Sequence, residues 1–274
     1  MSSAISRYEP GKKVIFLDFD GTYADDGVVP PGHVTAVREA QSNGHMVFLC
    51  TGRPRSGLGE HALAVGFDGL VCAAGGYVFV DEQVLLDRRF PAELAERTLA
   101  VLEEHDAVFI LETPEAIYVP EASERILRKL FTTHVDMIQT LKVEADVRGI
   151  PFSKITIVSS RKPIEELAAE IGDEVQALPS STHQIHGASG ELQLSDVHKA
   201  IGVELVAQYL GASMEDTIAF GDGMNDIEML AHAGTGVAIQ GGNSRVLEVA
   251  DMVTPGPREE GLAKAFAELG LTGS

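Results

Sequence analysis

The sequence predicts an α/β protein with a doubly wound, Rossmann-like parallel-sheet core and an α+β cap domain inserted into that core. Three observations predict this. Short apolar runs alternate with helical patterns from Val14 onward, polar residues follow several of these runs, and the alternation stops near residue 83 and resumes near residue 189. We therefore expect the core in residues 1–82 and 189–274, and the cap domain in residues 83–188.

The first part of the core is expected to contain three strands, two helices and a hairpin. Apolar runs predict strands at 14–17, 46–50 and 69–73, and helical spacing predicts helices at 31–43 and 55–65. A hairpin is predicted from the runs 75–80 and 84–86. Because strands that alternate with helices usually pair in parallel, the three strands should belong to one parallel sheet. The hairpin breaks this rhythm and marks the approach to the cap domain.

The middle of the sequence mixes helices with strands that suggest an antiparallel sheet. We expect helices at 92–105, 123–132 and 163–171, and strands at 108–111, 116–119, 155–158 and 174–178. The run 191–194 is expected to return the chain to the core. A helix at 200–210 and a strand at 217–220 should follow it.

The composition predicts a soluble, cytoplasmic protein without a membrane segment. No apolar stretch approaches the length that a bilayer requires, and Met1 to Lys13 lack the apolar run of a signal peptide. Cys50 and Cys72 lie in predicted strands, so we expect two reduced core residues. A formal net charge of −20 argues against nucleic acid as a partner. The oligomeric state stays open.

Carboxylates gather at the ends of two predicted strands. Asp18 and Asp20 follow the first strand, and alternate residues of an extended chain point the same way, so both can face one small volume. Asp222 and Asp226 follow the strand at 217–220. Crowded carboxylates repel one another, and a divalent cation or a protonated partner relieves that repulsion. An Asx turn that ends the strand is the alternative interpretation of the first pair.

Further polar residues follow the other strands of the predicted sheet. The second strand ends in Thr51-Gly52-Arg53, and Lys199 opens a predicted helix. Ligands bind at the carboxyl ends of strands in an open parallel sheet. Taken in order, DxDGT, TGR, a lone lysine and GDxxND resemble the motifs of the haloacid dehalogenase superfamily of phosphatases and phosphotransferases. The last third of the chain is similar to the Cof-like phosphatase branch.

This resemblance implies a role for each matching acid. Asp18 would be the nucleophile that becomes an aspartyl phosphate, and Asp20 would act as general acid and then as general base. Mg²⁺ would be held by Asp18, by the backbone carbonyl of Asp20 and by Asp222. The remaining metal ligands would be water and a substrate oxygen.

The resemblance also implies a phosphate-binding set. Thr51, the Gly52 backbone N–H, Lys199 and Asn225 would hold the phosphoryl oxygens, and Asn225 would also help Asp226 to orient the metal ligands. Arg53 either caps its loop or contacts the substrate, and both interpretations remain open.

The function implied by the resemblance is a magnesium-dependent phosphatase of a small phosphorylated metabolite, either a sugar phosphate or a phosphorylated cofactor. A phosphotransferase or sugar phosphomutase is one alternative, and a non-catalytic binding or regulatory protein on the same scaffold is another. The chain departs from the Cof-like pattern after the third strand. It has Ala74-Gly75-Gly76 where Asn-Gly-Ala is usual, so a polar side chain that often lies near the substrate is missing.

Overall fold

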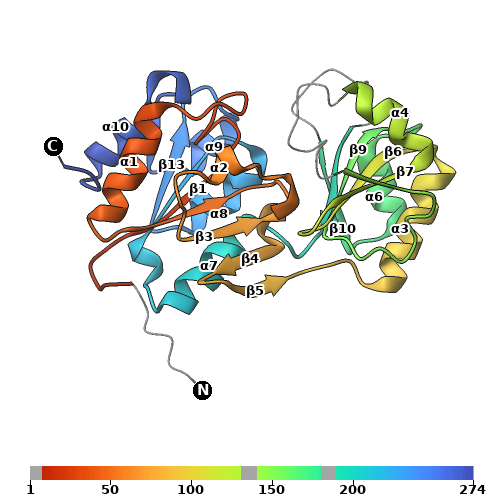
Figure 1. Cartoon of the computed structure of the whole chain (residues 1–274), viewed down its shortest axis with the longest axis horizontal. Helices are drawn as coiled ribbons and strands as arrows, with labels where there is room; N and C mark the ends of the chain where they lie inside the picture. Colours follow the sequence, from red (N-terminus) through yellow and green to blue (C-terminus); the bar gives the residue numbers. More distant parts are fainter. Residues whose placement is uncertain (1–7, 131–140, 180–188, 274) are drawn as a thin grey trace. The chain divides into compact units, whose positions relative to one another are not determined.

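The computed structural model describes residues 8–130, 141–179 and 189–273, and these fall into two compact units (Figure 1). We call the first the core unit; it is formed by the described parts of Met1–Gly52, Glu60–Leu86 and His198–Ser274. We call the second the cap unit; it is formed by the described parts of Arg53–Gly59 and Asp87–Val197. In this part of the chain, no helix is both long and apolar enough to cross a bilayer.

In the described residues, the core unit is built on an eight-stranded sheet with the order β14-β13-β12-β1-β2-β3-β4-β5. Its strands are β1 (Val14–Leu17), β2 (Met46–Cys50), β3 (Gly69–Cys72), β4 (Tyr77–Val80), β5 (Gln83–Asp87), β12 (Thr217–Gly221), β13 (Thr235–Ile239) and β14 (Met252–Thr254). Neighbours from β14 to β3 pair in parallel, and β4 runs antiparallel to β3. The chain winds outward in both directions from β1 and β12. The predicted doubly wound sheet is therefore confirmed.

Helices cover both faces of this sheet (Figure 1). The core helices are α1 (Pro31–Ser42), α2 (Glu60–Leu63), α7 (Lys199–Leu210), α8 (Ile227–His232), α9 (Ser244–Val249) and α10 (Gly261–Glu268). On one face, the ring of Phe266 in α10 packs 5.4 Å from that of Phe220 in β12. On the other, Val203 and Val206 of α7 pack with Phe16 and Phe48 of the sheet. Because both faces of the sheet are buried, the sequences of its strands are continuous apolar runs.

In the described residues, the cap unit contains a six-stranded sheet with the order β10-β11-β9-β6-β7-β8. Its strands are β6 (Val108–Glu112), β7 (Ile117–Pro120), β8 (Leu141–Glu144), β9 (Lys154–Ser159), β10 (Val175–Pro179) and β11 (Gly190–Leu194), and its helices are α3 (Ala92–Glu104), α4 (Glu121–Leu130) and α6 (Ile164–Ile171). Leu111 and Ile155 face the core cluster that contains residues of α3 and α6. Ile110 faces the opposite side, where it packs with Leu127 of α4. The sheet thus carries helices on both faces.

The strand at 191–194 was predicted to return the chain to the core, and this is wrong. As β11 it pairs antiparallel with β9 and β10 in the cap sheet, and the core unit resumes only at His198. The cap unit accordingly runs from Asp87 to Val197, with Arg53–Gly59 added, where residues 83–188 had been expected. Alternating polar and apolar residues predict a strand, but its partner strands are chosen by contacts far away in sequence.

Two further local predictions differ from the structure. The helix expected at 55–65 is replaced by a 3₁₀ turn, Arg55–Gly57, and the short α2, because Gly57 and Gly59 interrupt the helical stretch. In the cap sheet, β8 was not predicted, and it pairs in parallel with β7 although an antiparallel sheet was expected. The helix expected at 123–132 is described as α4, and its last two predicted residues lie outside the described residues.

Candidate active site

A buried lysine joins the two acidic strand ends of the core unit. Asp18 follows β1, and Asp226 lies in the loop that follows β12, the neighbour of β1 at the point where the strand order reverses. Lys199, the first residue of α7, is fully buried, and its Nζ donates to Oδ1 of both Asp18 and Asp226 at 2.5 Å. Three residues from distant parts of the sequence therefore form one ion-paired cluster.

The second oxygen of Asp226 holds the loop that carries Asp222. Its Oδ2 accepts hydrogen bonds from the backbone N–H groups of Asp222, at 3.0 Å, and Gly223, at 2.8 Å. A Cβ atom on Gly221 would lie 2.5 Å from Asp226, so only glycine leaves room for this carboxylate. Asp226 thus binds Lys199 with one oxygen and the backbone of the loop with the other. This arrangement suits a residue that orients Lys199 and Asp222.

Asp222 is positioned by the segment that follows Asp20. The Oγ1 of Thr22 donates to Asp222 Oδ1 at 3.0 Å. Gly21 has a φ of +85°, and a Cβ there would lie 2.5 Å from Asp222 Oδ2. The glycine and the threonine of the DxDGT motif therefore both serve the approach of Asp222 to the β1 loop.

The charges of this cluster are unbalanced. Burial raises the pKa of Asp18 well above its ordinary range, although the neighbouring Lys199 ammonium opposes the shift. Burial and the charge of Asp226 raise the pKa of Asp222 to about 6. Burial also acts to lower the pKa of Lys199, but Asp18 and Asp226 outweigh it, so that pKa lies above its usual value. The lysine therefore stays charged.

The donor set fits Mg²⁺. Asp18, Asp222 and Asp226 each offer a carboxylate oxygen, and these atoms all lie within 4.8 Å of one another. Hard divalent cations prefer oxygen ligands, and a set without nitrogen or sulfur favours Mg²⁺ or Mn²⁺ over Zn²⁺. Burial is the largest cause of the raised pKa values of Asp18 and Asp222, and a bound cation would favour the charged form of both carboxylates.

The other predicted site residues lie on neighbouring loops of the core unit. Asp20 is exposed, in the turn after β1. Thr51 is buried. Its N–H donates to Val71 O at 2.8 Å, and its carbonyl accepts from the Ala74 N–H at 3.1 Å. A Cβ atom on Gly52 would lie 3.1 Å from Asn225 Nδ2, so the structure brings the TGR and GDxxND loops together.

The direct pair between Lys199 and Asp226 was missed by sequence reasoning, which assigned Asp226 only to the orientation of the metal ligands. The two residues lie 27 positions apart, beyond any helical or strand period that could have signalled the contact. Arg53 belongs to the segment grouped with the cap unit. Both cysteines are buried and neither forms a disulfide, as predicted.

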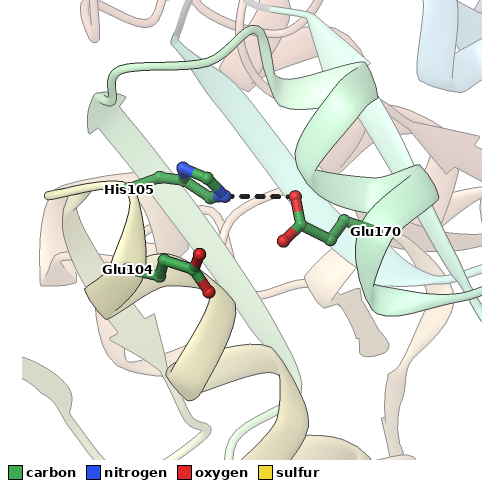
Figure 2. Close-up of side chains that lie close together, drawn as sticks. All are labelled: Glu104, His105 and Glu170. Carbon is green, nitrogen blue, oxygen red and sulfur yellow. Dashed lines mark hydrogen bonds and ion pairs between the residues drawn. The ribbon is translucent and has the colours of Figure 1, made fainter.

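A second group of possible metal ligands lies in the cap unit, where Glu104 and His105 at the end of α3 face Glu170 of α6 (Figure 2). His105 Nε2 lies 3.1 Å from Glu170 Oε2, and Lys162 Nζ donates to the same oxygen at 2.7 Å. Because Lys162 already supplies positive charge and both acids are accessible to water, we assign this group to the connection between α3 and α6.

The chain resembles known proteins over almost its whole length. The sequence model of the haloacid dehalogenase-like hydrolase family matches residues 15–266. Bacillus subtilis YkrA, whose phosphatase name is provisional, is 30% identical over 263 residues, which cover 94% of this chain and 98% of YkrA. Bacillus subtilis 5-amino-6-(5-phospho-D-ribitylamino)uracil phosphatase YcsE is 27% identical over 266 residues, covering 96% of this chain and 98% of YcsE.

Solved structures of the same superfamily have the same fold. The HAD subclass IIB sugar phosphatase BT4131 superposes with a TM-score of 0.81 at 25% identity, covering 95% of this chain and 100% of that one. The predicted family and fold class are confirmed by these matches, and so is the prediction of a hydrolytic enzyme.

Proposed function

The chain belongs to the haloacid dehalogenase-like hydrolases, and from this premise we propose that it is a magnesium-dependent phosphatase of a small phosphorylated metabolite. The observation that carries the proposal is the buried Lys199, paired with Asp18 and Asp226 beside Asp222. Lys199 fixes the orientation of the proposed nucleophile, and the three carboxylates around it offer oxygen ligands that could hold a divalent cation. The names of the relatives support a phosphoester as the substrate.

Two displacements at phosphorus describe the reaction. In the first, a carboxylate oxygen of Asp18 bonds to phosphorus and the bond from phosphorus to the ester oxygen breaks, while Asp20 gives its proton to that leaving oxygen. In the second, Asp20 takes a proton from water as the water oxygen bonds to phosphorus and the bond to Asp18 breaks. The carboxylate of Asp18 is restored and inorganic phosphate leaves.

The exposure of Asp20 suits this exchange. A general acid that becomes a general base must reach both the leaving group and water, and the side chain of Asp20 is exposed while that of Asp18 is buried. Burial protects the nucleophile from solvent, and Lys199 holds one of its oxygens in place. Asp18, the carbonyl of Asp20 and Asp222 would hold Mg²⁺, which when bound neutralises the carboxylates and the phosphoryl oxygens.

Thr51, the Gly52 N–H, Lys199 and Asn225 are proposed to hold the phosphoryl oxygens. The support is the closeness of Gly52 to Asn225 and the burial of Thr51 and Lys199 in the same unit. Hydrogen-bond donors fixed before the reaction stabilise charge that develops in the transition state. Sugar phosphates and phosphorylated cofactors both remain within the proposed class.

A phosphate-release screen tests this function. Purified protein would be incubated with a simple aryl phosphate and with a set of phosphorylated sugars and cofactors, each with and without Mg²⁺. We expect inorganic phosphate to appear with Mg²⁺ alone, without an acceptor sugar or a bisphosphate activator. Rapid isomerisation of a sugar phosphate with only slow phosphate release would instead show a phosphomutase.

A further inference from the structure

Three consecutive residues after β3 have left-handed backbone conformations. Ala73, Ala74 and Gly75 have φ values of +50°, +53° and +103°. The two alanines are 4% and 1% exposed, so this is a buried bend. Residues with a Cβ rarely adopt this conformation, and two in succession persist only where the surrounding structure enforces them.

On one side, the bend holds Thr51. The N–H of Ala74 donates to the carbonyl of Thr51 at 3.1 Å, and the N–H of Thr51 donates to Val71 O in β3 at 2.8 Å. Both backbone groups of Thr51 are therefore bound to β3 or to its exit. The orientation of the Thr51 side chain, and of the Gly52 N–H that follows, depends on where this bend lies.

On the other side, the bend contacts the start of α7. A Cβ atom on Gly75 would lie 2.2 Å from the carbonyl oxygen of His198 and 3.2 Å from the backbone nitrogen of Lys199. One turn further along α7, a Cβ on Gly202 would lie 2.3 Å from Val71 Cγ1. The first turn of the helix that carries Lys199 is thus seated directly on β3 and the bend.

We propose that the Ala73–Gly75 bend is a positioning element that sets Thr51 and Lys199 relative to each other for phosphoryl transfer. The inference rests on the proposed function, because it concerns how the phosphate-binding groups of that site are held. A residue with a Cβ has fewer accessible backbone conformations than glycine. Ala74 therefore holds the bend in one conformation more firmly than glycine would, at the cost of backbone strain. Gly75 is needed for the close approach to His198.

The test compares Ala74→Gly with a matched control, Glu82→Gly. Glu82 also has a positive φ, of +60°, but it lies in the turn between β4 and β5, outside the proposed machinery. Both substitutions relieve backbone strain. For each variant, kcat and KM for an aryl phosphate with Mg²⁺ would be measured, together with the urea midpoint and the exchange rate of the amide of residue 74 in metal-free protein.

We expect Ala74→Gly to lower kcat on the order of tenfold, with a smaller change in KM and no loss in urea midpoint, and to speed amide exchange at residue 74. Glu82→Gly should leave kcat unchanged. Gly75→Ala, which displaces the start of α7, should lower kcat by about 100-fold. If Gly75→Ala does not fold, the comparison of Ala74→Gly with Glu82→Gly still tests whether the bend positions Thr51 and Lys199.

Wild-type kcat and exchange in Ala74→Gly would overturn the inference, as would equal losses of kcat in Ala74→Gly and Glu82→Gly. A wild-type protein that releases no phosphate from any ester would overturn the proposed function instead. The two failures are therefore distinguishable, because the first requires an active wild-type enzyme.

Discussion

In the described residues, both units bury a lysine among carboxylates, but they hold it in different ways. In the core unit, Lys199 begins a helix and binds Asp18 and Asp226, which lie on loops beyond two strand ends. In the cap unit, Lys154 lies on β9, directly opposite Glu112 on β6, at 3.2 Å. Its Nζ also donates to Glu191 of β11 at 2.7 Å.

The two clusters differ in charge as well as in position. The core cluster has three carboxylates within ligand distance of one another and one lysine, whereas the cap cluster has two carboxylates and one lysine. In the cap, the hydroxyl of Thr156 donates to Glu112 at 2.6 Å, and the side chain of Glu191 is 31% exposed to water. With both acids ionised, the cap cluster therefore carries one excess negative charge, which the Thr156 hydroxyl and solvent stabilise, so the cluster suits a structural role. The core cluster, with all three acids ionised, carries two.

A buried lysine paired with carboxylates occurs in both units and so does not by itself mark a reactive site. What distinguishes the core cluster is a third carboxylate on a loop at the carboxyl end of a parallel sheet, where a ligand can reach it. The cap cluster is built into neighbouring strands, and strand pairing leaves its groups little freedom. Four experiments test this distinction.

The largest effect is expected from Asp18→Asn. The amide keeps the shape of the side chain but cannot attack phosphorus, so kcat should fall by about 10⁴-fold or more while the protein stays folded. Steady-state phosphate release and circular dichroism would measure the two properties. The matched control is Glu112→Gln in the cap cluster, which should retain turnover close to wild type. Comparable losses in both variants would remove the distinction between the clusters.

Removal of the metal is expected to have the second largest effect on turnover. Chelation should abolish turnover and added Mg²⁺ should restore it, because Asp18 and Asp222 need a cation to relieve their repulsion. Since the pKa of Asp222 is raised to about 6, protons compete with the metal below that pH. Mg²⁺ affinity, measured by titration calorimetry, should therefore weaken by up to about tenfold per pH unit below 6. Full turnover in metal-free protein would refute the site.

Lys154→Met should affect stability rather than chemistry. The substitution leaves Glu112 buried without its partner, at a cost of about 3–5 kcal/mol in the free energy of unfolding. Urea unfolding would measure this loss. The double variant Glu112→Leu with Lys154→Met removes both charges and should recover much of it. No recovery in the double variant would show that the pair does more than balance charge.

The smallest effect is expected from Asp222→Asn in metal-free protein. The folded-state pKa of Asp222, about 6, lies above its ordinary value of 3.8, so ionisation of this group costs stability above pH 6, and the cost disappears as the pH falls toward 3.8. The amide should therefore raise the free energy of unfolding at pH 7 by about 1–3 kcal/mol. The gain should shrink at pH 5. A variant less stable than wild type at pH 7 would show that the carboxylate contributes favourably without metal.

The sequence by itself predicted the doubly wound core with its strands β1, β2, β3 and β12, and it placed the proposed site residues beyond strand ends, whereas β13 and β14 were not predicted. Continuous apolar runs such as Val14–Leu17 predict buried parallel strands, and the carboxyl ends of parallel strands share one sheet edge, so Asp18 and Asp222 were expected at the same edge. The structure adds that β1 and β12 are neighbours. The resemblance to the haloacid dehalogenase motifs added Thr51 and Lys199. These features are local or follow from chain topology.

Only the tertiary structure decided the rest. It assigned β11 to the cap sheet, since strand partners are selected by distant side chains and not by the alternation within the strand. It paired Lys199 with Asp226, which no period in the sequence connects. It also revealed that Ala74 is held in a left-handed conformation, which contacts with Thr51 and α7 enforce against the intrinsic preference of alanine.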